Sequence, residues 1–149
     1  MEPFVTAGAG FLLAVLWFDL MLDVQALRGG REGLSEARLA SIAGYYRRVT
    51  TTARPMNRLI AAVMLFTLGA IIAQIAHGDR PRWVAWVSVL LAGGAIGLAG
   101  ARTVPNAVRL GSRRDPADRQ AALARSIGRD DLFCATAITA LLAIQLAFA

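Results

Sequence analysis

Two aspartates, Asp19 and Asp23, lie four residues apart near the end of a long apolar run, and their type and spacing could carry chemistry. Four-residue spacing places both carboxyl groups on one face of a helix. An aspartate at the centre of a membrane-spanning helix costs about 2.5 to 3.5 kcal/mol, so such a residue usually faces the bundle interior and has a partner. We therefore expect both acids to point inward. They form either an ion, proton or substrate site or a structural ion pair.

Four apolar runs must position these acids, and they cover residues 4–27, 57–77, 83–101 and 132–148. Each run is close to the roughly 20 residues that a helix needs to cross a bilayer. The sequence therefore predicts an all-α fold, a polytopic bundle of four transmembrane helices that forms a single domain over residues 1–149. Gly78, Asp79 and Pro81 predict a tight turn, which makes the second and third spans an antiparallel hairpin.

The basic residues orient this bundle. All 16 are arginines; seven lie in or beside each of the two long loops, two lie in the short loop, and none lies near either end of the sequence. The positive-inside rule then places both long loops in the cytoplasm and both termini outside. A chain without lysine is typical of a GC-rich bacterial genome, so we expect a bacterial inner membrane. This charge pattern also explains the pI of 11.2, and no nucleic-acid-binding motif is visible.

Further polar residues fall at the same depth as Asp23, because antiparallel helices bring the start of one span beside the end of another. We expect Arg58 and Arg102 to lie near Asp23 and to relieve its charge. Pro105 should kink or end the third helix and leave carbonyl groups free to bind a ligand. Besides the two aspartates, the candidate residues for a ligand or ion site are Asn57, Arg58, Arg102 and Asn106.

The long loops also contain helical patterns. In the first loop, Leu39, Ile42, Tyr46 and Val49 recur at helical spacing, which predicts an amphipathic helix lying on the inner membrane surface. Aromatic residues that flank the spans are expected to anchor the protein at the membrane interfaces, and they are Tyr45, Tyr46, Trp83 and Trp86.

In the second loop, Asp115 and Pro116 predict the start of a helix that ends near Ser126. Gly128, with Asp130 or Asp131, is expected to start the fourth span anew.

Few residues could bind a metal or a cofactor. His77 is the only histidine and Cys134 the only cysteine, which excludes a bis-histidine haem within one chain and a structural zinc site. Only a weak site for a hard cation, made of carboxylates and amides, stays open, and no cofactor or catalytic residue can be assigned. We expect Cys134 to fill space in the core. The polar residues within the spans should bond backbone carbonyls or a neighbouring helix, and they are Gln74, Thr136, Thr139 and Gln145.

Small residues form a stripe on the third span. Gly93, Gly97 and Ala101 are four residues apart and would let another helix approach closely. We expect that helix to belong to the same chain, because a four-helix bundle needs such contacts within itself. A homo-oligomer or a larger membrane complex formed through Gly93 and Gly97 is the alternative.

Three segments resemble a known family. They are LMLDVQ at the end of the first span, YYRRVTTTARPMNRL entering the second, and TVPNAVRL after the third. In layout and in these motifs the chain resembles the anthrone-oxygenase-like family of small four-helix bacterial membrane proteins. Pro105, Asn106 and Leu110 match only imperfectly the proline, asparagine and leucine that follow the family's third span. The histidine that often precedes the family's last span is absent, although Arg125 and Arg129 are present. The resemblance implies the four-helix fold and leaves the activity open.

Three hypotheses for function follow. The first is a non-enzymatic inner-membrane protein whose cytoplasmic polar layer binds a partner, an anionic lipid headgroup or an ion. The second is a proton-coupled carrier or membrane enzyme that uses Asp19 and Asp23 as its working groups, with a cavity open to the cytoplasm. The third is an accessory subunit of a larger membrane complex.

Overall fold

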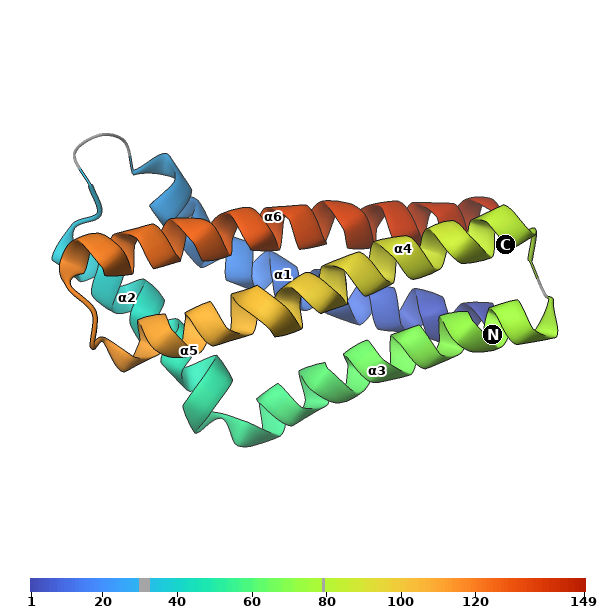
Figure 1. Ribbon diagram of the computed structural model, residues 1–149, viewed down its shortest axis with the longest axis horizontal. Helices are drawn as coiled ribbons and strands as arrows, with labels where there is room; N and C mark the ends of the chain where they lie inside the picture. The colour runs from blue at the N-terminus through green and yellow to red at the C-terminus, as the bar shows by residue number, and fades with distance from the viewer. Residues whose placement is uncertain (30–32, 79) are drawn as a thin grey trace.

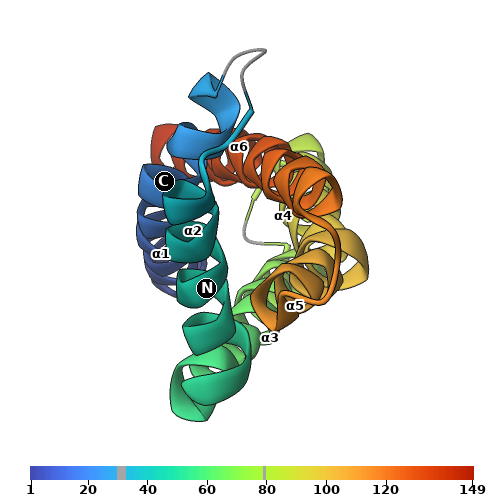
Figure 2. The same cartoon turned by 90° about the vertical axis from the view of Figure 1, so that its left-hand side faces the viewer.

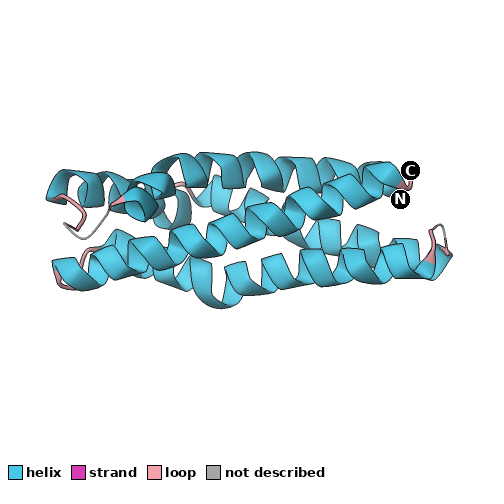
Figure 3. Ribbon diagram, turned by 90° about the horizontal axis from the view of Figure 1, so that it is seen from above, coloured by secondary structure: helices cyan, strands magenta, loops and turns pink. Residues whose placement is uncertain are grey.

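The computed structural model describes residues 1–29, 33–78 and 80–149, and all regular elements in these ranges are helices. Asp79, in the predicted turn, lies outside the described residues. In chain order the elements are α1 (Glu2–Arg28), α2 (Glu36–Arg47), the π-helix η1 (Arg48–Thr52), α3 (Arg54–His77), α4 (Arg82–Leu98), the π-helix η2 (Ala99–Thr103), α5 (Val104–Ser112) and α6 (Ala117–Ala147). Figure 3 shows that only short connections interrupt the helices.

Four helices are long and apolar enough to cross a membrane: α1, α3, the continuous segment Arg82–Ser112, and α6. The all-helical class predicted from the sequence is therefore confirmed. Each long helix packs against two others, in the order α1, α6, α4, α3 and back to α1. All four neighbouring pairs are antiparallel, which is the up-down-up-down arrangement of a simple bundle. Figure 1 shows both termini at the same end as the α3–α4 connection, and α2 at the opposite end. We call these the termini end and the α2 end.

The third long helix does not stop at Pro105. The backbone N–H of Val104 bonds the carbonyl of Ala99, five residues earlier, so η2 forms one π turn before the proline, and α5 continues to Ser112. Proline has no N–H with which to continue the α pattern, and π turns occur mostly as single turns inserted in α-helices. Of the two predicted effects of Pro105, an end of the helix is wrong, and the third span is longer than the predicted range 83–101.

The fourth long helix is also continuous, and the predicted restart near Gly128 is wrong. Helix α6 runs from Ala117 to Ala147 without a break. Gly128 instead lies where α1 crosses α6, since a Cβ atom added to it would come within 3.1 Å of Leu27 Cγ and 3.2 Å of Asp23 Cβ. The glycine permits a close helix–helix contact, and neighbouring turns of α6 keep the helix regular. The Asp115 carboxylate forms an ion pair with Arg109 and does not cap α6.

Helix α2 forms where an amphipathic helix was predicted, with Ser35 as its N-cap. Its apolar face, which includes Leu39, Ile42 and Tyr46, is covered by protein and not by lipid. This face is at most 4% exposed and packs against α5, α6 and α1. As Figure 2 shows, α2 lies across the α2 end of the four long helices.

A buried polar cluster lies inside the bundle toward the termini end. Gln74 and Gln145 exchange side-chain hydrogen bonds of 3.1 and 3.2 Å, and Gln145 Nε2 donates to Ser88 Oγ at 2.9 Å. This cluster connects α3, α4 and α6, as expected for amides in adjacent spans. Thr136 and Thr139 bond carbonyls four residues earlier in α6, as predicted. Cys134 is buried in the core, also as predicted.

The stripe of Gly93 and Gly97 is not where the bundle packs most tightly. An added Cβ at either residue would meet no atom within 4 Å. The close approaches are made by three other glycines: Gly8 of α1 against Thr67, Gly111 of α5 against the backbone of Arg47, and Gly128 of α6 against α1. The expectation that the stripe serves intrachain packing is therefore wrong, because small residues permit a close contact but do not select the helix that makes it.

Candidate functional site

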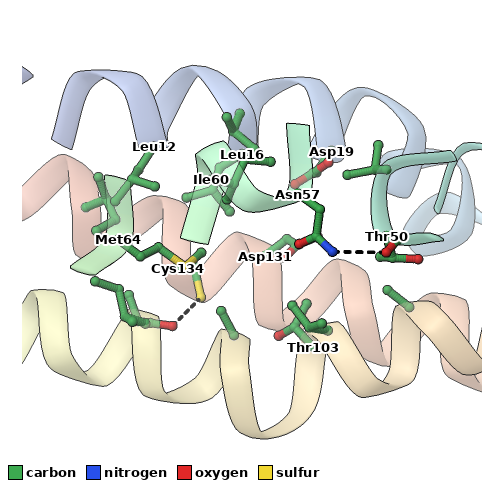
Figure 4. A pocket seen from close by; sticks show the side chains of 18 of the residues that line it. Leu12, Leu16, Asp19, Thr50, Asn57, Ile60, Met64, Thr103, Asp131 and Cys134 are labelled. Atoms are coloured by element: carbon green, nitrogen blue, oxygen red, sulfur yellow. Dashed lines mark hydrogen bonds between the residues drawn. The ribbon is translucent and has the colours of Figure 1, made fainter. Parts of the chain in front are cut away.

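A cavity of about 110 Å³ lies inside the bundle toward the α2 end. This volume is several times the roughly 10–15 Å³ that one water molecule needs. Figure 4 shows its two kinds of wall. Most lining side chains are apolar, among them Leu12, Leu16, Ile60, Met64, Ile96 and Ile138. The polar lining residues gather at one side, and they are Asp19, Tyr46, Thr50, Asn57, Thr103 and Asp131.

Two consecutive tyrosines of α2 hold the acids of α1. Tyr45 Oη donates to Asp19 Oδ1 at 2.7 Å, and Tyr46 Oη lies 2.8 Å from each carboxyl oxygen of Asp23. Tyr46 Oη is also 3.1 Å from Asp131 Oδ2 of α6. The hydroxyl of Tyr46 therefore connects three helices. Asp23 is fully buried and Asp131 is 4% exposed, so neither carboxyl group can rely on solvent.

The tyrosines act as hydrogen-bond donors here. Burial, together with the nearby carboxyl groups, raises the pKa of both Tyr45 and Tyr46 far above the ordinary value for a phenol. Each hydroxyl consequently keeps its proton at any physiological pH. These two residues were expected to anchor the protein at the membrane interface, and the structure instead turns their hydroxyl groups toward the interior.

The arginines do not surround Asp19 and Asp23. Arg102 Nε lies 3.2 Å from Asp130 Oδ2, and the Arg102 guanidinium also donates to Ser126. Arg58 is exposed, and no ion pair joins it to an acid of the described chain. Within residues 1–29, 33–78 and 80–149, no arginine pairs with Asp19, Asp23 or Asp131. Arg102, which was expected to lie near Asp23, thus pairs with Asp130 instead.

Thr103 contributes a hydroxyl without a partner. It is the last residue of η2, lines the cavity, and is only 7% exposed. In the part of the chain that the structure describes, its Oγ1 atom has no hydrogen-bond partner. Threonine in a regular α-helix commonly bonds the carbonyl four residues earlier, as Thr136 and Thr139 do here. An unsatisfied buried hydroxyl costs about 1–3 kcal/mol, so this one is available to a bound molecule.

A second π-helix, η1, also contributes to the polar side of the cavity. In η1 the N–H of Ala53 bonds the carbonyl of Arg48, five residues earlier, and Thr50 lines the cavity beside Tyr46. Asn57 of α3 fixes this segment, since its Nδ2 donates to the carbonyl of Thr50 at 3.0 Å. Two residues of the polar side, Thr50 and Thr103, therefore lie where a helix departs from the α pattern, as is frequent at functional sites.

The structure brings together some of the residues predicted from the sequence. Asp19 and Asn57 line the cavity, and Asp23 lies behind Tyr46. Arg102 belongs to a neighbouring ion pair, while Arg58 and Asn106 do not line the cavity. Sequence reasoning missed three residues of the site, Tyr46, Thr103 and Asp131. The helical spacing of Tyr46 with Leu39 and Ile42 already indicated a buried position, but no sequence signal marked the other two as neighbours.

Comparisons with known proteins return no relatives: no family model, no curated protein and no solved structure matches this chain. The chemistry of the site must be argued from its own residues. Its two carboxyl groups can accept hydrogen bonds and balance positive charge, the Thr103 hydroxyl, which has no partner among the described residues, can accept a hydrogen bond, and the apolar wall can contact hydrocarbon.

Proposed function

We propose that this protein is a small integral protein of a bacterial inner membrane that binds a small organic cation inside its four-helix bundle. The observation that carries the proposal is the cavity itself. Asp19, Asp131 and the free hydroxyl of Thr103 lie on its polar side, and none of the described residues that line it is basic. A carboxylate without a counter-ion is expensive in such surroundings, so a ligand cation would stabilise it.

The apolar wall favours an organic cation over a bare metal ion. Calcium and magnesium need about six oxygen ligands, whereas one side of this cavity offers only hydrocarbon. Within the described residues, no three His, Cys, Asp or Glu side chains are grouped so as to hold a metal. An ammonium group between Asp19 and Asp131, with an alkyl body against Ile60 and Met64, would satisfy both sides.

The outer surface of the long helices supports membrane insertion. Large apolar side chains point outward, with Leu65 70% and Leu90 72% exposed, and the same applies to Trp17, Phe18, Ile72 and Phe133. A soluble protein rarely exposes so continuous an apolar surface, and acyl chains would cover it. At the α2 end, exposed arginines would face anionic lipid headgroups, each attracted by about 1 kcal/mol. They are Arg38, Arg47, Arg48, Arg54 and Arg58.

Two of the three segments that carry the family resemblance contribute residues that line the cavity. Tyr46 and Thr50 come from the second segment, and Thr103, Val104 and Ala107 come from the third. Membership of the anthrone-oxygenase-like family remains a proposal. If the chain belongs to that family, motifs of the family would line a binding pocket.

We predict the orientation of the bundle with the α2 end in the cytoplasm. In a Cys134→Ala background, a cysteine placed at His77 should react with a membrane-impermeant maleimide in intact spheroplasts. A cysteine placed at Asp115 should react only after the membrane is opened. Both positions lie near helix ends, at opposite ends of the bundle. The reverse labelling pattern would overturn the orientation, and labelling of both in intact spheroplasts would contradict a membrane-spanning bundle.

The binding proposal is tested with n-butylammonium and its neutral counterpart n-butanol. Calorimetry on the protein in neutral-lipid nanodiscs should show binding of the ammonium and much weaker binding of the alcohol. Asp131→Asn should weaken ammonium binding at least about tenfold, because a lost charge–charge contact of about 1.4 kcal/mol corresponds to that factor. Asp115→Asn, at an exposed ion pair with Arg109, is the matched control and should bind as the unaltered protein does. Equal binding of ammonium and alcohol, or no effect of Asp131→Asn, would refute a cation site.

Thr103→Val separates a role in binding from a role in folding. Valine keeps the shape of threonine and removes a buried hydroxyl that has no partner in the described chain. We expect stability to be unchanged or to rise by about 1 kcal/mol. Ammonium binding should weaken several-fold, because the ligand loses an oxygen acceptor. A clear loss of stability would mean that the hydroxyl already has a partner, and unchanged affinity would remove Thr103 from the site.

A further inference from the structure

Tyr46 has one hydroxyl proton but two carboxyl neighbours. Its Oη lies 2.8 Å from both oxygens of Asp23 and 3.1 Å from Asp131 Oδ2. One O–H group donates one proton, so it cannot serve both residues at full strength. For both contacts to be hydrogen bonds, a second proton must be carried by one of the carboxyl groups, which then donates to the tyrosine oxygen.

The surroundings of this group also require a second proton. Asp23 and Asp131 are buried between α1, α2 and α6, and Asp19 of α1 adds a third acid nearby. The other titratable or charged groups facing it are Tyr45 and Tyr46 of α2 and Asp130 and Cys134 of α6. Arg102 of η2 is paired with Asp130, and no arginine of the described chain forms an ion pair with Asp23 or Asp131. Nothing among these groups neutralises two carboxylates at Asp23 and Asp131.

The two carboxyl groups differ in their access to the cavity. Asp131 lines it, whereas Asp23 is behind Tyr46 and is fully enclosed. Positive charge that arrives in the cavity therefore meets Asp131 directly and reaches Asp23 only through the shared hydroxyl. A proton held by this group and a cation held in the cavity compensate the same negative charge.

We propose that the organic cation and this proton exclude one another, so that cation binding releases one proton from the group formed by Asp23, Tyr46 and Asp131. This inference rests on the proposed function and names the ion, a proton, that is exchanged for the organic cation. The carboxyl O–H bond breaks, the proton passes to water through the polar side of the cavity, and the carboxylate left behind pairs with the ammonium group. The total charge within the bundle is the same before and after exchange. A bundle with this property could couple the movement of an organic cation to a proton gradient.

The test is calorimetry of n-butylammonium binding in buffers of different ionisation enthalpy. An alkylammonium with a pKa near 10, like the lysine side chain, stays protonated at neutral pH and supplies no proton itself. We expect release of about one proton per ammonium bound. Over the pH range in which the group holds its second proton, the apparent affinity for ammonium should fall about tenfold for each unit of pH decrease, because the proton competes for the site.

Asp23→Asn should bind n-butylammonium without releasing a proton and with little dependence on pH, because only one carboxyl group is left beside Tyr46. Asp115→Asn, far from this group, should keep the proton release and the pH dependence of the unaltered protein. If Asp23→Asn does not fold, the pH series on the unaltered protein decides by itself. Binding of ammonium without proton release, at an affinity independent of pH, would overturn the exchange and leave the proposed function standing. Absence of ammonium binding, or equal binding of n-butanol, would instead overturn the proposed function.

Discussion

Tyr46→Phe is expected to destabilise the protein by about 3 kcal/mol. Tyr46 belongs to α2 and is only 4% exposed. The substitution keeps its ring and removes only the hydroxyl that lies between Asp23 and Asp131. Hydrogen bonds to charged groups contribute about 1.5–3 kcal/mol to stability. Removing one partner of a buried hydrogen bond also leaves the other partner unsatisfied. The two acids, which belong to different helices, would then lose the hydroxyl donor that they share. Reversible unfolding in mixed detergent micelles measures the effect.

Tyr45→Phe is the matched comparison for that substitution. Tyr45 bonds Asp19 alone and is only half-buried, so solvent or a bound ligand can replace its hydroxyl. We expect a loss of about 1 kcal/mol. Equal effects of the two substitutions would mean that the shared hydroxyl of Tyr46 has no special role. A stabilising effect of Tyr46→Phe would mean that the two acids do not need a donor.

Gly128→Val should destabilise the contact between α1 and α6 by about 2–3 kcal/mol. The first added carbon would already lie 3.1 Å from Leu27 Cγ and 3.2 Å from Asp23 Cβ, and valine adds two more methyl groups. Overpacking of a close contact typically costs about 1–3 kcal/mol, because backbone or rotamers must shift. Here the shift would also displace Asp23 from Tyr46, so ammonium binding should weaken as well. Unfolding in micelles and calorimetry report the two effects separately.

Gly69→Val provides the control for the backbone effects of replacing glycine within a helix. Gly69 lies in α3, it is exposed, and a Cβ atom there would meet nothing within 4 Å. Both substitutions exchange glycine for a β-branched residue in a helix, so the difference between them isolates the contact with α1. If Gly69→Val and Gly128→Val change stability equally, then α1 and α6 are not held as closely as the structure has them.

The sequence predicted the four long helices well because each follows from a run of apolar residues. It also located α2, since Leu39, Ile42 and Tyr46 repeat at helical spacing. What covers that face could not be predicted in the same way, because an amphipathic pattern is the same whether lipid or protein lies against it. The continuity of α6 through Gly128 was missed for a related reason. A glycine that ends a helix and one that admits a neighbouring helix are identical in sequence, and only the crossing of α1 distinguishes them.

The candidate site was predicted in part. Asp19 and Asp23 stood out because a carboxyl group within an apolar run is costly, whereas Asp131 follows the polar stretch before the fourth run and looked like a helix start. The pairing of Arg102 with Asp130 depends on the rotation of α6 relative to η2, which no local pattern encodes. The position of the Thr103 hydroxyl depends on the π turn, which shifts this residue relative to its place in a regular α-helix.

An organic cation held in the bundle beside Asp131 can be located directly by crystallography. Crystals of the protein grown with 3-bromopropylammonium would show the bromine by its anomalous scattering. We expect a bromine peak against the apolar wall near Ile60 and Met64, with the ammonium nitrogen within hydrogen-bond distance, about 3 Å, of the Asp131 carboxylate. Bromine peaks confined to the outer surface, with the cavity free of ligand, would contradict a cation site beside Asp131.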